Sequence, residues 1–191
     1  MSAQTQWHMP DDVLRPPWSA FLDDLDALVR GPTELHCLGG FVIAELYDFD
    51  RVTVDIDVIR VRGEDPATLA RVAGHGSELH RRHKVYLDIV TVAQWPENYE
   101  GRLLDLRLGE FRNLRLKAME RHDLALAKLV RNLDRDREDV KRLAAGPGLD
   151  ATVLRERYQT ELRYQLGRPD REDLTLDLWL EMIDEVSTGR P

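Results

Sequence analysis

The chain has 191 residues, 42% of them hydrophobic, which is enough to bury one full core or one core with a small helical appendage. Lys and Arg number 27 against 35 Asp and Glu, and the net charge of −8 is opposite to that of proteins that coat nucleic acid. No apolar run approaches the roughly 20 residues that span a bilayer, and the N-terminus lacks the order of a signal peptide, so we expect a soluble, cytoplasmic protein without a membrane partner.

The first half of the chain alternates between helical and strand patterns. Apolar spacing, with Gly and Pro at the breaks, predicts a helix over 18–29, a strand over 34–38, a helix over 41–47, a strand over 51–61, a helix over 65–73 and a strand over 84–92. In the strand over 51–61, Val52, Val54, Ile56 and Val58 are expected to face the core. Cys37, the only cysteine, excludes an internal disulfide and is expected to be a small buried apolar residue.

The second half becomes helical after about Glu120. Weaker patterns predict a strand near 104–108 or 114–116, before helices over 124–133 and around 140–143. Asp150 can cap a helix that runs to about Leu166, and a last helix is expected over 174–186.

Three aspartates occupy the centres of predicted strands. Side chains alternate along a strand, so Asp55 and Asp57 share one face, and Asp88, between Leu87 and Ile89, also points away from an apolar face. If the two strands are neighbours, three carboxylates converge, and a hard cation such as Mg²⁺ or Mn²⁺ would balance their repulsion. The alternative is the solvated face of an amphipathic strand, but Asp is depleted in strands and three occur here.

Three segments carry a family resemblance: Leu38-Gly39-Gly40, Thr53-Val54-Asp55-Ile56-Asp57 and Leu87-Asp88-Ile89. Together they resemble the nucleotidyltransferase superfamily with the polymerase-beta-type fold. The resemblance implies an α+β protein: a mixed β-sheet flanked by helices (residues 1–118), then a small C-terminal helical region (residues 119–191). It also implies that Asp55, Asp57 and Asp88 hold divalent metals, and that Gly39, Gly40 and Thr53 lie at the nucleotide. Many members have Gly-Ser where this chain has Gly39-Gly40-Phe41, so a serine contact to phosphate is absent.

A second resemblance covers Asp123–Lys128 and Arg131–Asp139, which look like the AbiEii and DUF6036 branch of this superfamily, often toxins of toxin–antitoxin pairs. It implies active-site roles for Lys128 and Asp136, and an antitoxin partner. Lys128, Arg131 and Arg135 at i, i+3 and i+7 would place three cations on one helical face, suited to a triphosphate. The alternative is a solvated basic stripe.

These resemblances imply an enzyme that transfers a nucleotidyl group from a nucleoside triphosphate to an acceptor hydroxyl of RNA (such as tRNA), protein or a small molecule. A metal nuclease is disfavoured, because no Glu-x-Lys triplet follows the aspartates. A non-catalytic nucleotide-binding or antitoxin-type module of the same fold stays open. The basic run over 80–84 could guide RNA or nucleotide, or could be an exposed turn.

Overall fold

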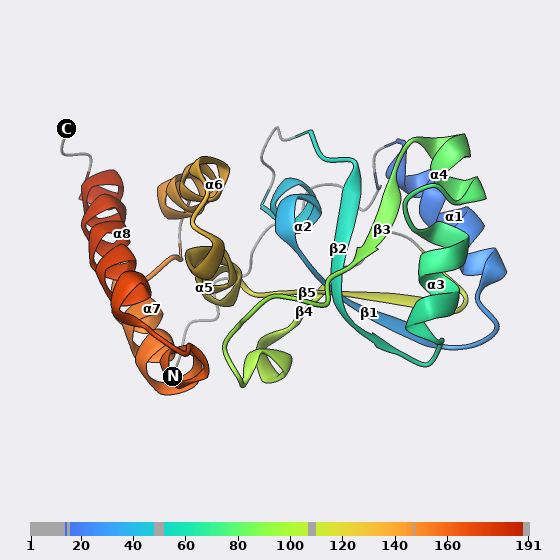
Figure 1. Ribbon diagram of the computed structural model, residues 1–191. Coiled ribbons are helices and arrows are strands. Elements are labelled where there is room, and N and C mark those ends of the chain that lie inside the picture. Colours follow the sequence, from blue (N-terminus) through green and yellow to red (C-terminus); the bar gives the residue numbers. More distant parts are fainter. Residues whose placement is uncertain (1–13, 15, 48–51, 107–109, 147, 189–191) are drawn as a thin grey trace, which may run out of the picture. The chain divides into compact units, whose positions relative to one another are not determined.

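A computed structural model describes residues 14, 16–47, 52–106, 110–146 and 148–188 of the chain (Figure 1). The chain forms two compact units. Residues 1–89 together with 105–116 make up the sheet unit, and residues 90–104 together with 117–191 make up the helical unit. Within the described ranges, no helix combines the length and the apolar character needed to cross a bilayer.

A five-stranded mixed sheet has the strand order β3-β2-β1-β5-β4 (Figure 1). Its strands are β1 (Thr33–Leu38), β2 (Asp55–Arg62), β3 (Tyr86–Ile89), β4 (Leu104–Leu106) and β5 (Leu114–Ala118). β2 runs antiparallel to β1 and parallel to β3. A parallel pair needs a crossover of a dozen or more residues, and the segment that holds α3 and α4 supplies it.

The helices of the sheet unit are α1 (Trp18–Leu28), α2 (Gly39–Leu46), α3 (Pro66–Ala73) and α4 (Glu78–His83). Asp65 begins α3 by accepting a hydrogen bond from the Thr68 N–H at 2.8 Å. α2 packs against β1 and β2, α3 against β3, and α1 against α4. The rings of Trp18 and Phe41 meet at 5.0 Å and join α1 to α2, and Cys37 is buried as expected.

The helical unit contains η1 (Tyr99–Arg102), α5 (Arg121–Arg131), α6 (Asp134–Ala145), α7 (Ala151–Arg157), the π-helix η2 (Tyr158–Leu162), the 3-10 helix η3 (Arg163–Gln165) and α8 (Asp170–Thr188). Asp150 caps α7 as predicted, by accepting hydrogen bonds from two backbone N–H groups. Arg102 donates to Asp123 at 2.8 Å and to Glu161 at 2.7 Å. These ion pairs explain why residues 90–104 fold with the helices rather than with the strands.

The fold class predicted from the sequence, an α+β protein with a mixed sheet flanked by helices and a C-terminal helical part, is confirmed. Two details of the prediction are wrong. β2 begins only at Asp55, so Val52 and Val54 do not face the core and are 93% and 51% exposed. Residues 80–83 of the basic run belong to α4 rather than to an exposed turn, Lys84 follows that helix, and β3 is confined to Tyr86–Ile89.

Asp26 of α1 holds the backbone that leads into β5. Its carboxylate accepts hydrogen bonds from the N–H groups of Asn113 (2.7 Å), Leu114 (2.8 Å) and Arg112 (2.9 Å). Burial raises the pKa of Asp26, but these three N–H groups outweigh that effect and hold the pKa below its ordinary value. The ionised carboxylate therefore stabilises the fold.

We expect Asp26→Asn to lower the free energy of unfolding at pH 7 by about 1–3 kcal/mol, because an amide replaces a charged acceptor of three N–H groups. The pKa is lower in the folded than in the unfolded state, so the stabilisation is present above the unfolded pKa and is lost as the pH falls through the folded one. Urea unfolding across pH should show parent and variant converging in acid. Asp23→Asn, at an exposed position of α1, is the control. A difference in the free energy of unfolding between parent and Asp26→Asn that stays constant across pH would contradict a stabilising role for the ionised Asp26 carboxylate.

Candidate active site

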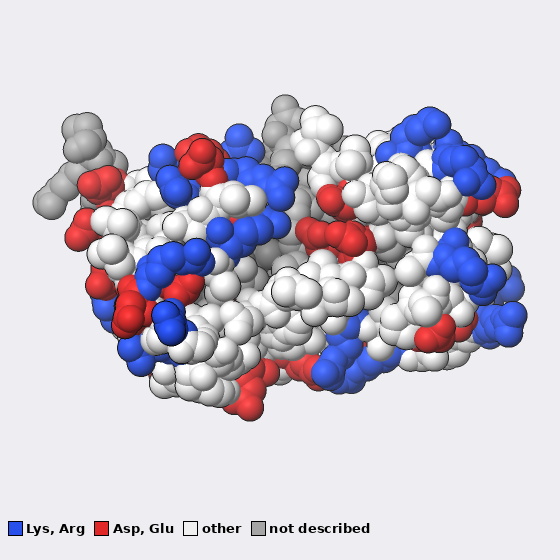
Figure 2. Space-filling model, viewed as in Figure 1, with Lys and Arg blue, Asp and Glu red and all other residues white. Residues whose placement is uncertain are grey.

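The register between β2 and β3 places the three predicted aspartates on one face of the sheet. Asp57 lies opposite Asp88, and Asp55 lies opposite Tyr86. Ile56 and Leu87, between them in sequence, are buried on the other face. Asp55, Asp57 and Asp88, called the acidic face below, therefore lie together on adjacent strands; Figure 2 shows acidic side chains gathered over this region of β2 and β3.

Gly39 brings the start of α2 against the acidic face. Its φ of +79° is a conformation that L side chains rarely adopt. A Cβ built on Gly39 would overlap Oδ2 of Asp57, so the backbone passes the carboxylate where a side chain cannot fit. The sequence placed a glycine turn before a helix that starts at Phe41; instead, Gly39 and Gly40 are the first residues of α2.

Thr53 precedes β2 and orients one of the carboxylates. Its hydroxyl donates to Oδ1 of Asp55 at 2.7 Å. The role predicted for Thr53 was a place at the nucleotide; the contact in the structure is with Asp55. Beside the acidic face, burial and the charges of Asp55, Asp88 and Asp57 raise the pKa of Tyr86.

The donor chemistry of the acidic face fits a hard divalent cation. Carboxylate oxygens on neighbouring strands are the ligands that Mg²⁺ and Mn²⁺ prefer, and Gly39 keeps the adjacent space free of a side chain. Within the residues that the structure describes, no three His, Cys, Asp or Glu side chains are gathered tightly enough to form a preassembled cage. A cation bound at the acidic face would have to draw these carboxylates together.

The second predicted group of site residues lies in the helical unit. Lys128 of α5 is only 4% exposed, and its Nζ lies 2.6 Å from Asp139 and 3.4 Å from Asp136, both fully or almost fully buried on α6. Arg131 also binds Asp136, with two hydrogen bonds of 2.8 and 2.5 Å. These four residues are called the α5–α6 charge cluster below.

Asp136 is the centre of this cluster. Burial raises its pKa, but hydrogen bonds from Arg131 and from the N–H of Leu133, with the charge of Lys128, hold the pKa below its ordinary value. Asp136 thus joins α5 to α6 as an anion. Asp139 was not among the predicted site residues, although its spacing of three from Asp136 and its place beside the core residue Val140 already indicated an inward-facing side chain.

The predicted stripe of three cations on one helix is wrong. Asn132 adopts a left-handed conformation with φ of 48° and ends α5, so Arg135 belongs to α6. Arg135 is exposed, whereas Lys128 is buried, so the two side chains do not form one accessible surface. Neither of the alternatives weighed from the sequence, a triphosphate-binding face or a solvated stripe, describes Lys128.

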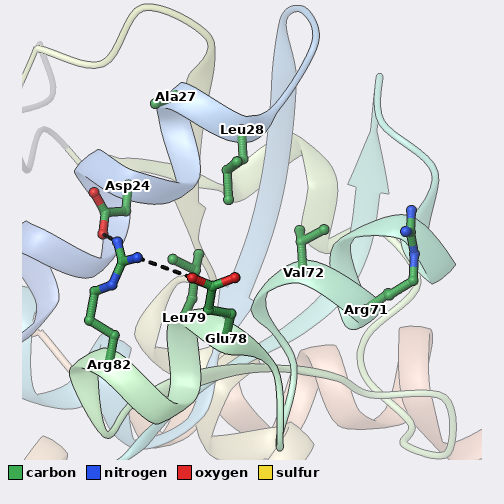
Figure 3. Close-up of a pocket in the computed structure, with 8 residues that line it drawn as sticks. All are labelled: Asp24, Ala27, Leu28, Arg71, Val72, Glu78, Leu79 and Arg82. Atoms are coloured by element: carbon green, nitrogen blue, oxygen red, sulfur yellow. Dashed lines mark hydrogen bonds and ion pairs between the residues drawn. The ribbon is translucent and has the colours of Figure 1, made fainter.

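Part of the basic run is used inside the sheet unit. The side chains of Arg82 and His83 both bond Oδ2 of Asp24, at 2.8 Å each, and tie α4 to α1. Arg82 also bonds Glu78 and lines a pocket of about 430 Å³ between α1, α3 and α4 (Figure 3). None of the three aspartates of the acidic face lines this pocket. Arg82 and His83 therefore have a structural role.

We expect Gly39→Ala to lower the free energy of unfolding by about 1–2 kcal/mol from backbone strain alone. The added methyl group should also displace the Asp57 carboxylate and weaken Mn²⁺ binding, as measured by calorimetry. Gly31→Ala is the matched control, since its Cβ would meet open space and its φ is not positive. Equal effects of the two substitutions would remove the special role of Gly39.

We expect Lys128→Ala to lower the free energy of unfolding by about 3–5 kcal/mol, because it leaves two buried carboxylates without this cation. Arg135→Ala, at an exposed position of α6, should change stability by no more than about 0.5 kcal/mol. Urea unfolding of both variants measures these changes. Similar losses in the free energy of unfolding for Lys128→Ala and Arg135→Ala would contradict a structural role for Lys128.

Comparison with protein families adds an independent finding. A family model described as "Nucleotidyltransferase of unknown function (DUF6036)" matches residues 25–186, which include both the acidic face and the α5–α6 charge cluster. Searches among curated proteins and among solved structures found no match in either set. The family match covers well over half of the chain, and the protein therefore belongs to this nucleotidyltransferase family.

Proposed function

We propose that the protein is a metal-dependent nucleotidyltransferase that transfers a nucleotidyl group from a nucleoside triphosphate to an acceptor hydroxyl. The observation that carries the proposal is the acidic face: Asp57 in register with Asp88, Asp55 on the same side, and Gly39 against Asp57. The family match supports the reaction class. In the reaction, the acceptor oxygen forms a bond to the α-phosphorus, the bond from that phosphorus to the β-bridging oxygen breaks, pyrophosphate leaves, and the hydroxyl proton passes to water.

Each residue of the site has a defined task. Asp55, Asp57 and Asp88 would hold Mg²⁺ or Mn²⁺, and Thr53 orients Asp55. A metal bound there would supply Lewis-acid activation of the acceptor oxygen and charge neutralisation on the pyrophosphate. The start of α2 offers backbone N–H groups and the positive end of a helix dipole to phosphate oxygens, and Gly39 lets them approach.

The α5–α6 charge cluster has a structural role in this proposal. Its buried ion pairs hold α5 and α6 together, and the contribution of Lys128 is to form those ion pairs. The resemblance of this segment to AbiEii-like toxins supports, as a further proposal, a toxin role with an antitoxin partner. A module of the same fold that binds nucleotide without turnover is the competing function.

Pyrophosphate release tests the proposal directly. The parent protein with Mg²⁺ or Mn²⁺ should release pyrophosphate from at least one of the four nucleoside triphosphates when an acceptor is present. Asp57→Asn and Asp88→Asn should lower turnover by about 100-fold or more, because each removes a ligand from a charge stabilisation worth several kcal/mol. Both variants should stay folded, since removing like-charge repulsion does not cost stability.

Asp23→Asn is the matched control, an exposed aspartate of α1 away from the strands, and should keep parental turnover. Nucleotide binding by the parent without pyrophosphate release, under every metal and nucleotide, would favour the non-catalytic module. Full activity of both Asp57→Asn and Asp88→Asn would contradict the site.

A further inference from the structure

Three aromatic rings cluster at the start of β3. The ring centroids of His75 and His80 are 4.6 Å apart, those of His80 and Tyr86 are 5.0 Å apart, and those of His75 and Tyr86 are 5.1 Å apart. Gly76 donates its N–H to Nδ1 of His80 at 2.8 Å, which holds the loop of His75 against α4. His75, His80 and Tyr86, called the ring cluster below, keep part of their surface accessible.

The ring cluster adjoins the acidic face. Tyr86 is the direct partner of Asp55 across the β2–β3 pair, and it lies two residues before Asp88, so its side chain is on the same face as all three aspartates. A bridge between Gly74 and Leu87 brings the chain that leaves α3 alongside β3 and places His75 next to Tyr86. Strands in a sheet lie about 4.8 Å apart, so Tyr86 is an immediate neighbour of the carboxylates, and His75 and His80 pack against Tyr86.

The other side of the ring cluster is basic. Arg81 and Lys84 are exposed members of the same run as Arg82, and both lie near enough to His80 to act on it electrostatically. Loss of solvation, then the charges of His75, Lys84 and Arg81, lower the pKa of His80, which favours a neutral, stacking ring at neutral pH. Figure 2 shows basic side chains gathered around α4, and uncharged surface lies between them and the acidic side chains over β2 and β3.

We propose that the ring cluster binds the acceptor of the reaction, and that this acceptor is the end of a single-stranded RNA. Bases stack on exposed aromatic rings, while Arg81 and Lys84 contact the phosphates. A base held on Tyr86 sets its own sugar hydroxyls beside Asp55. The inference rests on the proposed transfer to a hydroxyl, and it requires only a local basic patch on a chain whose net charge is −8.

The base of the nucleoside triphosphate is the competing ligand for the rings. RNA is favoured because cations and rings adjoin one another here, and an RNA strand needs contacts to successive phosphates and bases. The phosphates of a nucleoside triphosphate would instead lie at the metal, so that ligand would not need the cations beside the rings. The two sides of the ring cluster also differ in charge: the side at α4 is basic and the side at β2 is acidic. This is expected if an RNA strand enters along α4 and ends at the carboxylates.

Fluorescence anisotropy with a short single-stranded RNA, in the full chain and without nucleotide or metal, tests this inference without requiring turnover. His75→Ala should weaken RNA binding about 5- to 100-fold, the range for loss of one stacked base. His75→Phe should restore most of the affinity, because a ring is kept while the imidazole is lost. Tyr164→Ala, which removes a ring that is 60% exposed on the helical unit, should have no effect.

The outcomes separate this inference from the proposed function. Unchanged RNA affinity in His75→Ala overturns the RNA subsite, even if the parent releases pyrophosphate. If His75→Ala loses affinity for the nucleoside triphosphate while its RNA affinity is unchanged, the rings bind the nucleotide, and the RNA subsite is overturned as well. Weaker RNA binding in His75→Ala, with rescue by His75→Phe and unchanged thermal unfolding, supports the subsite whether or not the parent turns over.

Discussion

The parallel register between β2 and β3 is the constraint on which the rest of the site depends. It sets Asp57 opposite Asp88 and Asp55 opposite Tyr86. A slip of one residue would turn Asp88 toward the core and Leu87 toward solvent, because side chains alternate along a strand. Burial of Leu87 and Ile56 prevents this slip. The hydrophobic effect on one face of the sheet therefore places both the carboxylates and the ring of Tyr86 on the other.

Charge is handled differently in the two units. In the sheet unit, three carboxylates share one face and fit a cation from outside the protein. In the helical unit, buried carboxylates are balanced from within: Lys128 faces Asp136 and Asp139, and Arg131 binds Asp136 as well. An ion pair that is buried in this way is costly to break, because either partner alone would be an uncompensated charge. The acidic face instead presents carboxylate oxygens on one side of the sheet, the donors that a hard divalent cation prefers.

Much of this arrangement follows from local sequence, and what does not follow depends on long-range contacts. The alternation around Asp55 and Asp57 and the cap at Asp150 were sufficient to predict a strand and a helix. Val52 continues the same alternation, yet lies outside β2 and in solvent, because strand ends depend on the pairing partner rather than on the pattern. The helical spacing of Lys128, Arg131 and Arg135 also continues through Asn132. In the structure Asn132 adopts a left-handed conformation that ends α5, so Arg135 belongs to α6. Alternation cannot reveal that His75 meets Tyr86, which the path of the chain after α3 decides.

The central claim is that the acidic face binds a divalent metal, and Mn²⁺ titration followed by electron paramagnetic resonance tests it most directly, since bound Mn²⁺ loses its free-ion signal. We predict that the parent binds Mn²⁺, more tightly when a nucleoside triphosphate is present, and that the double variant Asp57→Asn/Asp88→Asn binds Mn²⁺ at least about tenfold more weakly, equivalent to 1.4 kcal/mol. Identical Mn²⁺ binding by the parent and the double variant, with and without nucleotide, would contradict it.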